Sequence, residues 1–387
     1  MNILIHDLSE NEWKKIENKY PRDEWFIISD NKKIQPCFGC FNCWLKTPGM
    51  CVIKDGYEST ASFMAKCEEI EIITKYTFGG FSSFVKNVID RSLSYLLPFL
   101  KNEGSEMHHY LRYGKTQIPF TVHFYGDLIS QEDQEIAKKY VKALCVDLKA
   151  KIKSIDFTNT NPTENSEKQE LKSKKIENKT IFLNCSLRGE HSNTKVFLNK
   201  IIENINCEFE NYNLINYLNK QDELIEILQT AEKIIFGTPM YVDGMPSSVV
   251  RIFEKLNKCD KNGHKKVYFV SNMGFFESIQ QVNLLNIAKN WCEKTGYDYY
   301  GSIAIGGGES LGNIAKSCPL TKGPMKSVGN AILKLADSIS KSEKMNDIYA
   351  EPYKLPRFLY ILIANIGFKK AGKNHGLKTK DLYKRID

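Results

Sequence analysis

Short apolar runs alternate with helical periodicity along the first 158 residues. An apolar run of about four to eight residues predicts a strand, and apolar residues spaced three or four apart predict a helix. The predicted strands are Asn2–His6, Trp25–Ser29, Ile70–Thr74, Pro119–Tyr125 and Ile152–Phe157. Helical patterns lie between them, as at Glu10–Tyr20 and Gln131–Lys149. Strands that alternate with helices indicate a parallel sheet with crossover helices.

The same alternation returns in residues 180–339. Its predicted strands are Thr180–Cys185, Glu208–Leu214, Lys233–Gly237, Lys266–Ser271 and Tyr299–Ile305. The intervening residues 159–179 contain almost no apolar side chain, which predicts a solvated linker. A βα series with five strands is typical of a flavodoxin-like doubly wound sheet of strand order 2-1-3-4-5, in which ligands bind at the carboxyl ends of the strands.

Two segments, 67–91 and 231–255, share one pattern at an offset of 164 positions. Each is an apolar run, a glycine-containing loop with aromatic residues, and a helical segment opened by serines. The matching pairs include Ile70 with Ile234, Gly80 with Gly244, and Ser83 with Ser247. We therefore predict two tandem flavodoxin-like α/β domains, 1–158 and 180–339, packed as an internal pseudo-dimer and followed by a basic, helical C-terminal tail, 340–387.

The net charge of +8 is concentrated in that tail, which carries 11 basic and 5 acidic residues. A nucleic-acid-binding protein usually spreads its basic side chains over a whole domain. This distribution therefore argues against nucleic acid as a partner. The apolar segment Phe358–Phe368 is too short for stable membrane insertion, and we expect it to form a helix packed on the protein.

The sequence predicts a cytoplasmic protein. It starts without the basic and apolar regions of a signal peptide, and no apolar run approaches the ~18 residues of a membrane span. Eleven cysteines in such a compartment argue against a disulfide framework and for metal or redox use of any that are clustered.

The loop after the first strand of the second domain suits a phosphate group. Small hydroxyl and amide side chains at a strand-to-helix turn let backbone N–H groups point at an anion, and Arg188 adds a charged donor. In the other interpretation, Ser192 or Thr194 only caps the helix. The equivalent loop of the first domain holds Asp7, Glu10 and Glu12, which would repel a phosphorylated ligand.

The second domain resembles the NAD(P)H-dependent FMN reductase branch of the flavodoxin-like superfamily. That branch shows G-S-x-R-x-x-S-x-T after the first strand and T-P-x-Y-x-x-x-x-P-x-x-x-K after the third. Here Cys185 replaces the first glycine, and Val250 stands where lysine is common. The resemblance implies that the FMN phosphate is held by Ser186, Arg188, Ser192, Asn193 and Thr194. It implies that the flavin ring is lined by Pro239, Met240, Tyr241, Val242, Asp243, Gly244, Ser271, Asn272 and Gly274.

The first domain instead carries a cysteine loop, Cys37, Cys40, Cys43 and Cys51, spaced C-x2-C-x2-C-x7-C. Four thiolates suit an iron–sulfur cluster or tetrahedral zinc, and this spacing is more typical of [4Fe–4S] ligation. The segment resembles the cluster motif of the iron–sulfur flavoproteins, another subgroup of the same superfamily. A [4Fe–4S] cluster, a reduced metal-free loop and zinc remain open as interpretations.

Together these features predict an FMN-dependent NAD(P)H oxidoreductase or electron-transfer flavoprotein. It would reduce a small acceptor such as a quinone, a nitro compound or a flavin, with the chemistry carried by the flavin rather than by a protein acid or base. By the resemblance, a cluster on the first domain would face FMN on the second, and a further homodimer remains open. The alternative is a non-catalytic tandem flavodoxin-like carrier or scaffold.

Overall fold

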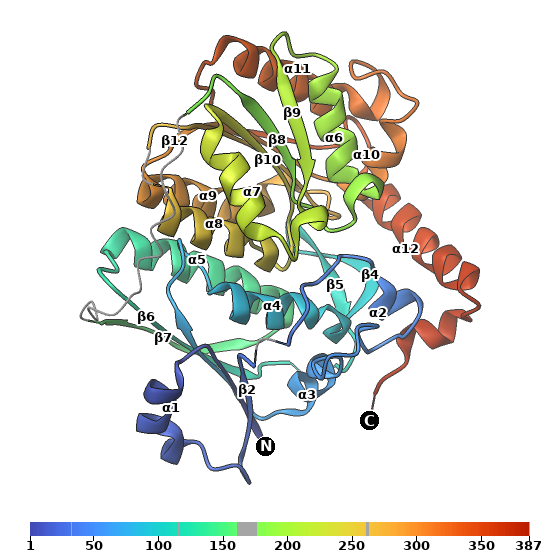
Figure 1. The fold of residues 1–387 in the computed structure, drawn as a ribbon. Helices are drawn as coiled ribbons and strands as arrows, with labels where there is room; N and C mark the ends of the chain where they lie inside the picture. The colour runs from blue at the N-terminus through green and yellow to red at the C-terminus, as the bar shows by residue number, and fades with distance from the viewer. Residues whose placement is uncertain (32, 115, 161–175, 261–262, 387) are drawn as a thin grey trace. The chain divides into compact units, whose positions relative to one another are not determined.

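The computed structural model describes residues 1–31, 33–114, 116–160, 176–260 and 263–386 (Figure 1). It divides into two compact units. The first unit comprises Met1–Asn165 with Ile361–Asp387, and the second comprises Ser166–Tyr360. Most of the predicted linker, 159–179, lies outside the described residues.

The first unit is built on a five-stranded parallel sheet of order β2-β1-β3-β6-β7. Its strands are β1 (Asn2–His6), β2 (Trp25–Ser29), β3 (Ile70–Lys75), β6 (Pro119–Gly126) and β7 (Lys151–Asn159). Its main helices are α1 (Glu10–Ile16), α3 (Thr60–Lys66), α4 (Ser83–Arg91) and α5 (Gln131–Leu148). This is the predicted order 2-1-3-4-5.

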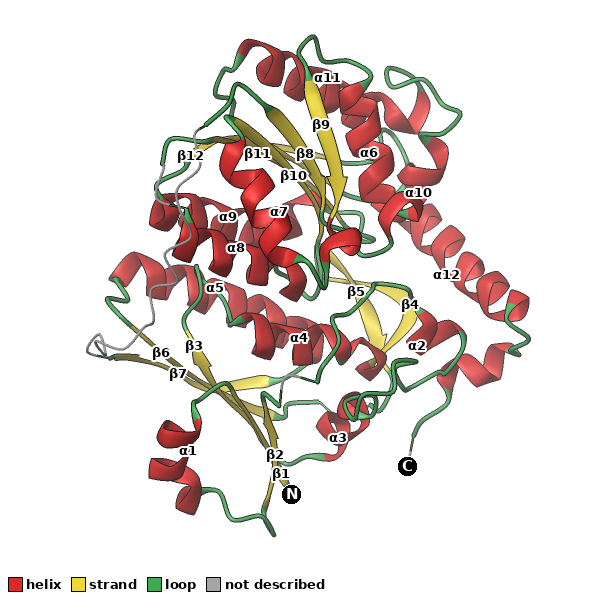
Figure 2. Cartoon of the chain, viewed as in Figure 1, coloured by secondary structure: helices red, strands yellow, loops and turns green. Residues whose placement is uncertain are grey.

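The second unit repeats the plan in a parallel sheet of six strands, order β13-β12-β11-β10-β8-β9 (Figure 2). Its strands are β8 (Thr180–Asn184), β9 (Phe209–Asn213), β10 (Lys233–Pro239), β11 (Lys266–Asn272), β12 (Asp298–Ile305) and β13 (Ile348–Ala350). Its longer helices are α6 (Asn193–Ile202), α7 (Gln221–Thr230), α8 (Ser247–Cys259), α9 (Val282–Thr295) and α11 (Lys326–Lys341).

The core of the second unit lies between the sheet and the helices α6 and α11. Phe182, Ile235 and Val270 extend from neighbouring strands and pack with Ile332 and Leu335 of α11. The helices α7, α8 and α9 cover the opposite face (Figure 2). The α/β fold with two tandem flavodoxin-like sheets is therefore confirmed.

β13 was not predicted. Its three residues form the sixth strand of the second sheet, although they belong to the segment that we predicted as a tail. The predicted tail helix is present as α12 (Arg357–Asn374).

The predicted repeat is visible in the backbone of both units. A two-residue turn follows β3 at Thr77–Gly80 and follows β10 at Tyr241–Gly244, and each is closed by two backbone hydrogen bonds of 2.9–3.1 Å. The central residues have positive φ, 53° and 95° at Phe78 and Gly79, and 43° and 58° at Val242 and Asp243. Paired positive values define a type I′ turn. Both units therefore present the same turn at the same sheet edge.

Among the described residues, the first unit has elements without a counterpart in the second. They are α2 (Asn42–Leu45) in the cysteine loop, an antiparallel hairpin of β4 (Leu96–Glu103) and β5 (Glu106–Leu111), and the chain from Ile361 onward. These additions pack on one another through Leu97, Phe99 and Leu382, with Leu45 and Phe368 against them.

Candidate functional site

The loop between β8 and α6 is held in place by its own side chains. Ser192 is the N-cap of α6, and its hydroxyl accepts a hydrogen bond of 3.1 Å from the backbone N–H of Lys195. The hydroxyl of Ser192 also donates to the carbonyl of Gly189 over 2.7 Å. The capping interpretation therefore describes what Ser192 does, and its cap orders the start of the helix, where the first N–H groups have no intrahelical partner.

Asn184, which sequence analysis missed, organises the same loop. Its buried amide donates to the carbonyl of Gly189 over 3.0 Å and to Asn213 over 2.9 Å, and accepts from the backbone of Ser186 over 3.2 Å. An amide at the last position of an otherwise apolar strand is the signal that could have identified it. The loop shape is therefore set largely without a bound ligand.

Two of the predicted phosphate residues converge on one anion of the protein itself. The amide of Asn193 donates to Oε2 of Glu309 over 2.8 Å, and Nη1 of Arg188 lies 3.5 Å from the same oxygen. Glu309 belongs to α10 (Gly308–Ile314) and was not predicted as a site residue. The side chains of Arg188 and Asn193 are thus already oriented toward a negative charge.

The two predicted flavin loops lie side by side because β10 and β11 are neighbours. Pro239 pairs with Asn272 in the parallel register, and the N–H of Met240 donates to the carbonyl of Asn272 over 2.8 Å. The amide of Asn272 also donates to the hydroxyl of Thr194 over 2.7 Å, which links the flavin loops to the phosphate loop. All the predicted FMN residues therefore lie at the carboxyl edge of one sheet.

Individual residues at this edge differ in exposure. Asp243 and Ser271 are buried, and the hydroxyl of Ser271 has no hydrogen-bond partner among the residues that the structure describes. Gly274 is exposed, and a side chain added there would meet nothing within 4 Å. Its carbonyl accepts a hydrogen bond from the hydroxyl of Tyr360. The hydroxyl of Ser271 is therefore enclosed by protein, whereas the backbone at Gly274 is open.

The equivalent edge of the first unit is filled by Asp7. Its carboxylate accepts hydrogen bonds from the N–H of Lys75 (3.0 and 3.1 Å), the hydroxyl of Thr74 (3.1 Å) and the hydroxyl of Tyr125 (3.0 Å). Burial raises the pKa of Asp7, although these hydrogen bonds oppose the shift. Glu12 closes a capping box with Ser9 at the start of α1. In the first unit this edge therefore carries a hydrogen-bonded carboxylate.

The four clustered cysteines are free thiols with different exposure. Cys40 is exposed, Cys37 and Cys43 are half-buried and Cys51 is buried. Burial raises the pKa of Cys37 to about 12, and the charges of Asp90, Cys51 and Cys40 add to the shift. Burial also raises the pKa of Cys43, again with contributions from the other three thiols. Since the neighbouring thiols contribute to the raised pKa of both Cys37 and Cys43, the loop brings the four cysteines into one region.

No metal centre can be assigned from these positions. In the described part of the chain, no three His, Cys, Asp or Glu side chains are placed to hold one metal ion. A [4Fe–4S] cluster takes its four thiolates on separate irons, whereas zinc gathers them on one atom.

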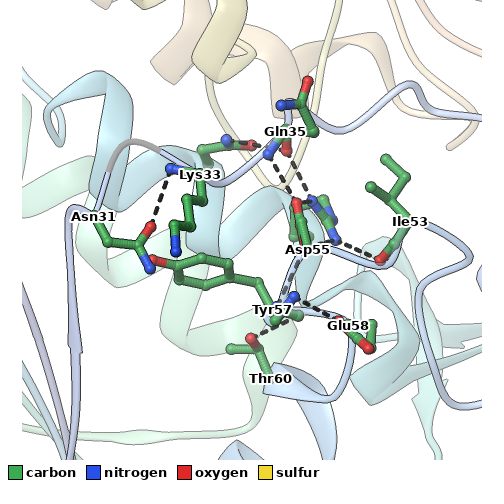
Figure 3. Close-up of polar contacts among 11 residues, drawn as sticks. Asn31, Lys33, Gln35, Ile53, Asp55, Tyr57, Glu58 and Thr60 are labelled. Atoms are coloured by element: carbon green, nitrogen blue, oxygen red, sulfur yellow. Dashed lines mark hydrogen bonds and ion pairs between the residues drawn. The ribbon is translucent and has the colours of Figure 1, made fainter.

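Arg91 of α4 clamps the two ends of the cysteine loop. Its buried guanidinium donates to both carboxylate oxygens of Asp55 (2.7 and 3.0 Å), to the carbonyl of Gln35 (2.8 Å) and to that of Ile53 (3.3 Å). Asp55 in turn accepts from the N–H of Gln35 over 2.8 Å, and both residues are drawn in Figure 3. Gln35 precedes the first cysteine and Ile53 follows the last, so one arginine fixes where the loop begins and ends.

The middle of the cysteine loop is anchored by Trp44. Its buried indole donates to the carbonyl of Leu96 over 2.9 Å, and its ring lies 4.8 Å from the ring of His109. The ring of Phe368 meets it edge-on at 5.6 Å. The hairpin and α12 therefore both contact the thiol-bearing segment through Trp44.

Comparisons with known proteins give fold-level likeness only. No protein-family model matches the chain, and no curated protein matches it. Among solved structures, an azoreductase from Bacillus anthracis str. Sterne is 15% identical and aligns over 43% of this chain and 100% of its own, with a TM-score of 0.32. The Trp repressor binding protein from Bacillus subtilis is 17% identical, over 43% and 99%, with a TM-score of 0.31.

A third match is an FMN-dependent NADH-azoreductase from Bacillus anthracis str. Ames Ancestor in complex with FMN. It is 11% identical and aligns over 51% of this chain and 99% of its own, with a TM-score of 0.23. Identities and scores this low say nothing about activity, so the fold rests on the strand order. None of the described helices is both long enough and apolar enough to cross a membrane.

Proposed function

We propose that the second unit binds FMN and catalyses NAD(P)H-dependent reduction of a small acceptor such as a quinone, a nitro compound or a flavin. The observation that carries this proposal is the convergence of Arg188 and Asn193 on one anionic oxygen at the start of α6. A charged donor and a side-chain amide directed at one oxygen, at the start of a helix whose positive end favours anions, suit a phosphate group. The fold supports the same position, because ligands of doubly wound sheets bind at the carboxyl ends of the strands.

The residues present fit such a ligand. Arg188, Asn193 and the first N–H groups of α6 would hold the phosphate, while the turn Tyr241–Gly244 would lie along the ring. FMN, when bound, supplies hydride acceptance and the release of electrons, so the protein contributes position and electrostatics rather than an acid or a base.

Replacing Arg188 with alanine tests the phosphate contact. A hydrogen bond to a charged group contributes about 1.5–3 kcal/mol, so we expect the Kd for FMN to rise by about 10- to 100-fold. Flavin fluorescence quenching on titration measures that Kd. Lys200→Ala, which removes a positive charge from the far end of α6, is the matched control and should leave the Kd unchanged. Equal Kd values for wild type and Arg188→Ala would contradict the proposed site.

Turnover distinguishes the enzyme from the carrier. NAD(P)H oxidation by the FMN-loaded protein with a quinone or nitro acceptor supports the oxidoreductase. FMN that stays bound without any NAD(P)H oxidation would favour a non-catalytic flavin carrier instead.

We further propose that Cys37, Cys40, Cys43 and Cys51 hold a [4Fe–4S] cluster in the first unit. The support is the spacing of the four thiols, C-x2-C-x2-C-x7-C. Cys40→Ala is expected to lower the iron content of anaerobically purified protein severely, because one of four ligands is lost, while the FMN content stays the same. Cys318→Ala, at a half-buried thiol of the second unit, is the control. Zinc in place of iron, or iron unchanged by Cys40→Ala, would overturn the cluster.

A further inference from the structure

Glu309 places a carboxylate where the proposed ligand would place its phosphate. One oxygen, Oε2, accepts the hydrogen bond from Asn193 over 2.8 Å and lies 3.5 Å from Nη1 of Arg188. The side chain of Glu309 is 44% exposed, so it can leave this position for water without first opening the core. The anion position is therefore occupied by a group that is able to move away.

Gly312 lets α10 come close enough for this contact. A Cβ at Gly312 would lie 2.2 Å from Oδ1 of Asn193, and one at Gly306 would lie 2.0 Å from the carbonyl of Phe276. Gly307, which caps α10, has φ +64°, a backbone conformation that favours glycine. With a side chain at Gly312, α10 would be held away from Asn193 of the phosphate loop, whereas Gly306 packs on Phe276 and Gly307 on Pro352. Gly312 thus allows α10 to place Glu309 beside Arg188 and Asn193.

We propose that Glu309 is a built-in competitor for the phosphate of the ligand, an inference that rests on the proposed FMN site. A phosphate dianion and a carboxylate repel each other when both lie beside Arg188. In their present geometry, Arg188 and Asn193 cannot bind both groups at once. Binding of a phosphorylated flavin therefore requires Glu309 to leave, which weakens the affinity for it. A flavin without phosphate meets no such competition, so Glu309 narrows the preference of the site for FMN over riboflavin.

The test compares Glu309→Gln with wild type on both flavins. Removing the negative charge should lower the Kd for FMN on the order of tenfold, because the repulsion with the phosphate disappears, and should change the Kd for riboflavin less than about twofold. Glu190→Gln is the matched control: it neutralises a nearby carboxylate of the phosphate loop itself, which pairs with Lys195 rather than Arg188 and should change the Kd for FMN less than Glu309→Gln does. An unchanged or higher Kd for FMN, or equal tightening of both flavins, would overturn the inference.

A second measurement separates this inference from the proposed function. The thermal shift caused by inorganic phosphate alone reports on the anion position without any flavin. A larger phosphate-induced shift in Glu309→Gln than in wild type supports the competition even if neither protein binds FMN, an outcome that would refute only the proposed FMN function. Identical phosphate-induced shifts in the two proteins would refute the competition.

Discussion

Arg91→Ala is expected to destabilise the first unit by about 3–5 kcal/mol, since it leaves the partner of a buried ion pair uncompensated. The guanidinium is fully buried and donates to Asp55 and to the carbonyls of Gln35 and Ile53, and all of these contacts are lost together. The ends of the cysteine loop would then be free to separate. The four thiols should become more reactive toward an aromatic disulfide reagent than in wild type.

Tryptophan fluorescence in a denaturant titration reports mainly on the first unit, because Trp13, Trp25 and Trp44 are three of the four tryptophans. Lys14→Ala breaks the exposed ion pair with Glu10 and should leave the unfolding midpoint unchanged. Arg91→Lys should recover only part of the stability, because lysine cannot make the bidentate contact. If Arg91→Ala unfolded at the wild-type midpoint with unchanged thiol reactivity, the contacts of Arg91 with Asp55, Gln35 and Ile53 would not stabilise the protein.

Acid is expected to destabilise the first unit through two buried histidines. Burial, assisted by the charge of Arg22, lowers the pKa of His6 from 6.5 to about 4. Burial likewise lowers the pKa of His109 from 6.5 to about 4. Between pH 6.5 and about pH 4, both histidines are protonated in the unfolded chain and neutral in the folded chain. The free energy of unfolding therefore falls as the pH falls through this range. From pH 7 to pH 5 each histidine should remove about 2 kcal/mol from the free energy of unfolding.

The variants His6→Phe and His109→Phe, which keep an aromatic ring, test whether these histidines cause the loss of stability in acid. His6 stacks on Trp13 at 4.4 Å and His109 packs against Trp44, so phenylalanine keeps the aromatic contacts. Each variant should lose less stability than wild type between pH 7 and pH 5. His108 acts in the opposite direction, because Asp147, hydrogen-bonded at 2.7 Å, outweighs burial and raises its pKa. Equal pH dependence in wild type and both variants would show that the two rings do not control acid stability.

The parallel sheets could be predicted from sequence because buried strands in such folds are mostly apolar, as in Ile72–Ile73 of β3 and Ile234–Phe236 of β10. The repeat of 67–91 at 231–255 then predicted which loops lie at the carboxyl edge of each sheet. β13 could not be found in this way, because three residues have no readable alternation. The hairpin β4–β5 was not predicted because its sequence, with His108 and His109 in adjacent positions, follows neither the strand period nor the helix period clearly.

The candidate site likewise contains residues whose positions the sequence predicts and residues whose positions it does not predict. Arg188, Asn193 and the loop after β10 are neighbours in sequence or in the repeat, so their proximity follows from topology. Glu309 is separated from Asn193 by 116 positions, and only the packing of α10 brings it to the phosphate loop. Arg91 was within the repeat, yet its contact with Asp55 depends on the course of a loop that no periodicity describes.

Arg112 ties the cysteine-bearing unit to a late part of the chain. Its Nη1 donates to the carbonyl of Leu382, 270 residues further on, and to that of Lys384, each over 2.8 Å. A ribosome adds about 5–20 residues per second, so this partner emerges on the order of tens of seconds after Arg112. A Cβ at Gly49, inside the cysteine loop, would also touch Ile386 at 2.9 Å. During synthesis the cysteine loop therefore lacks its contacts with the C-terminal residues until the second sheet has been synthesised.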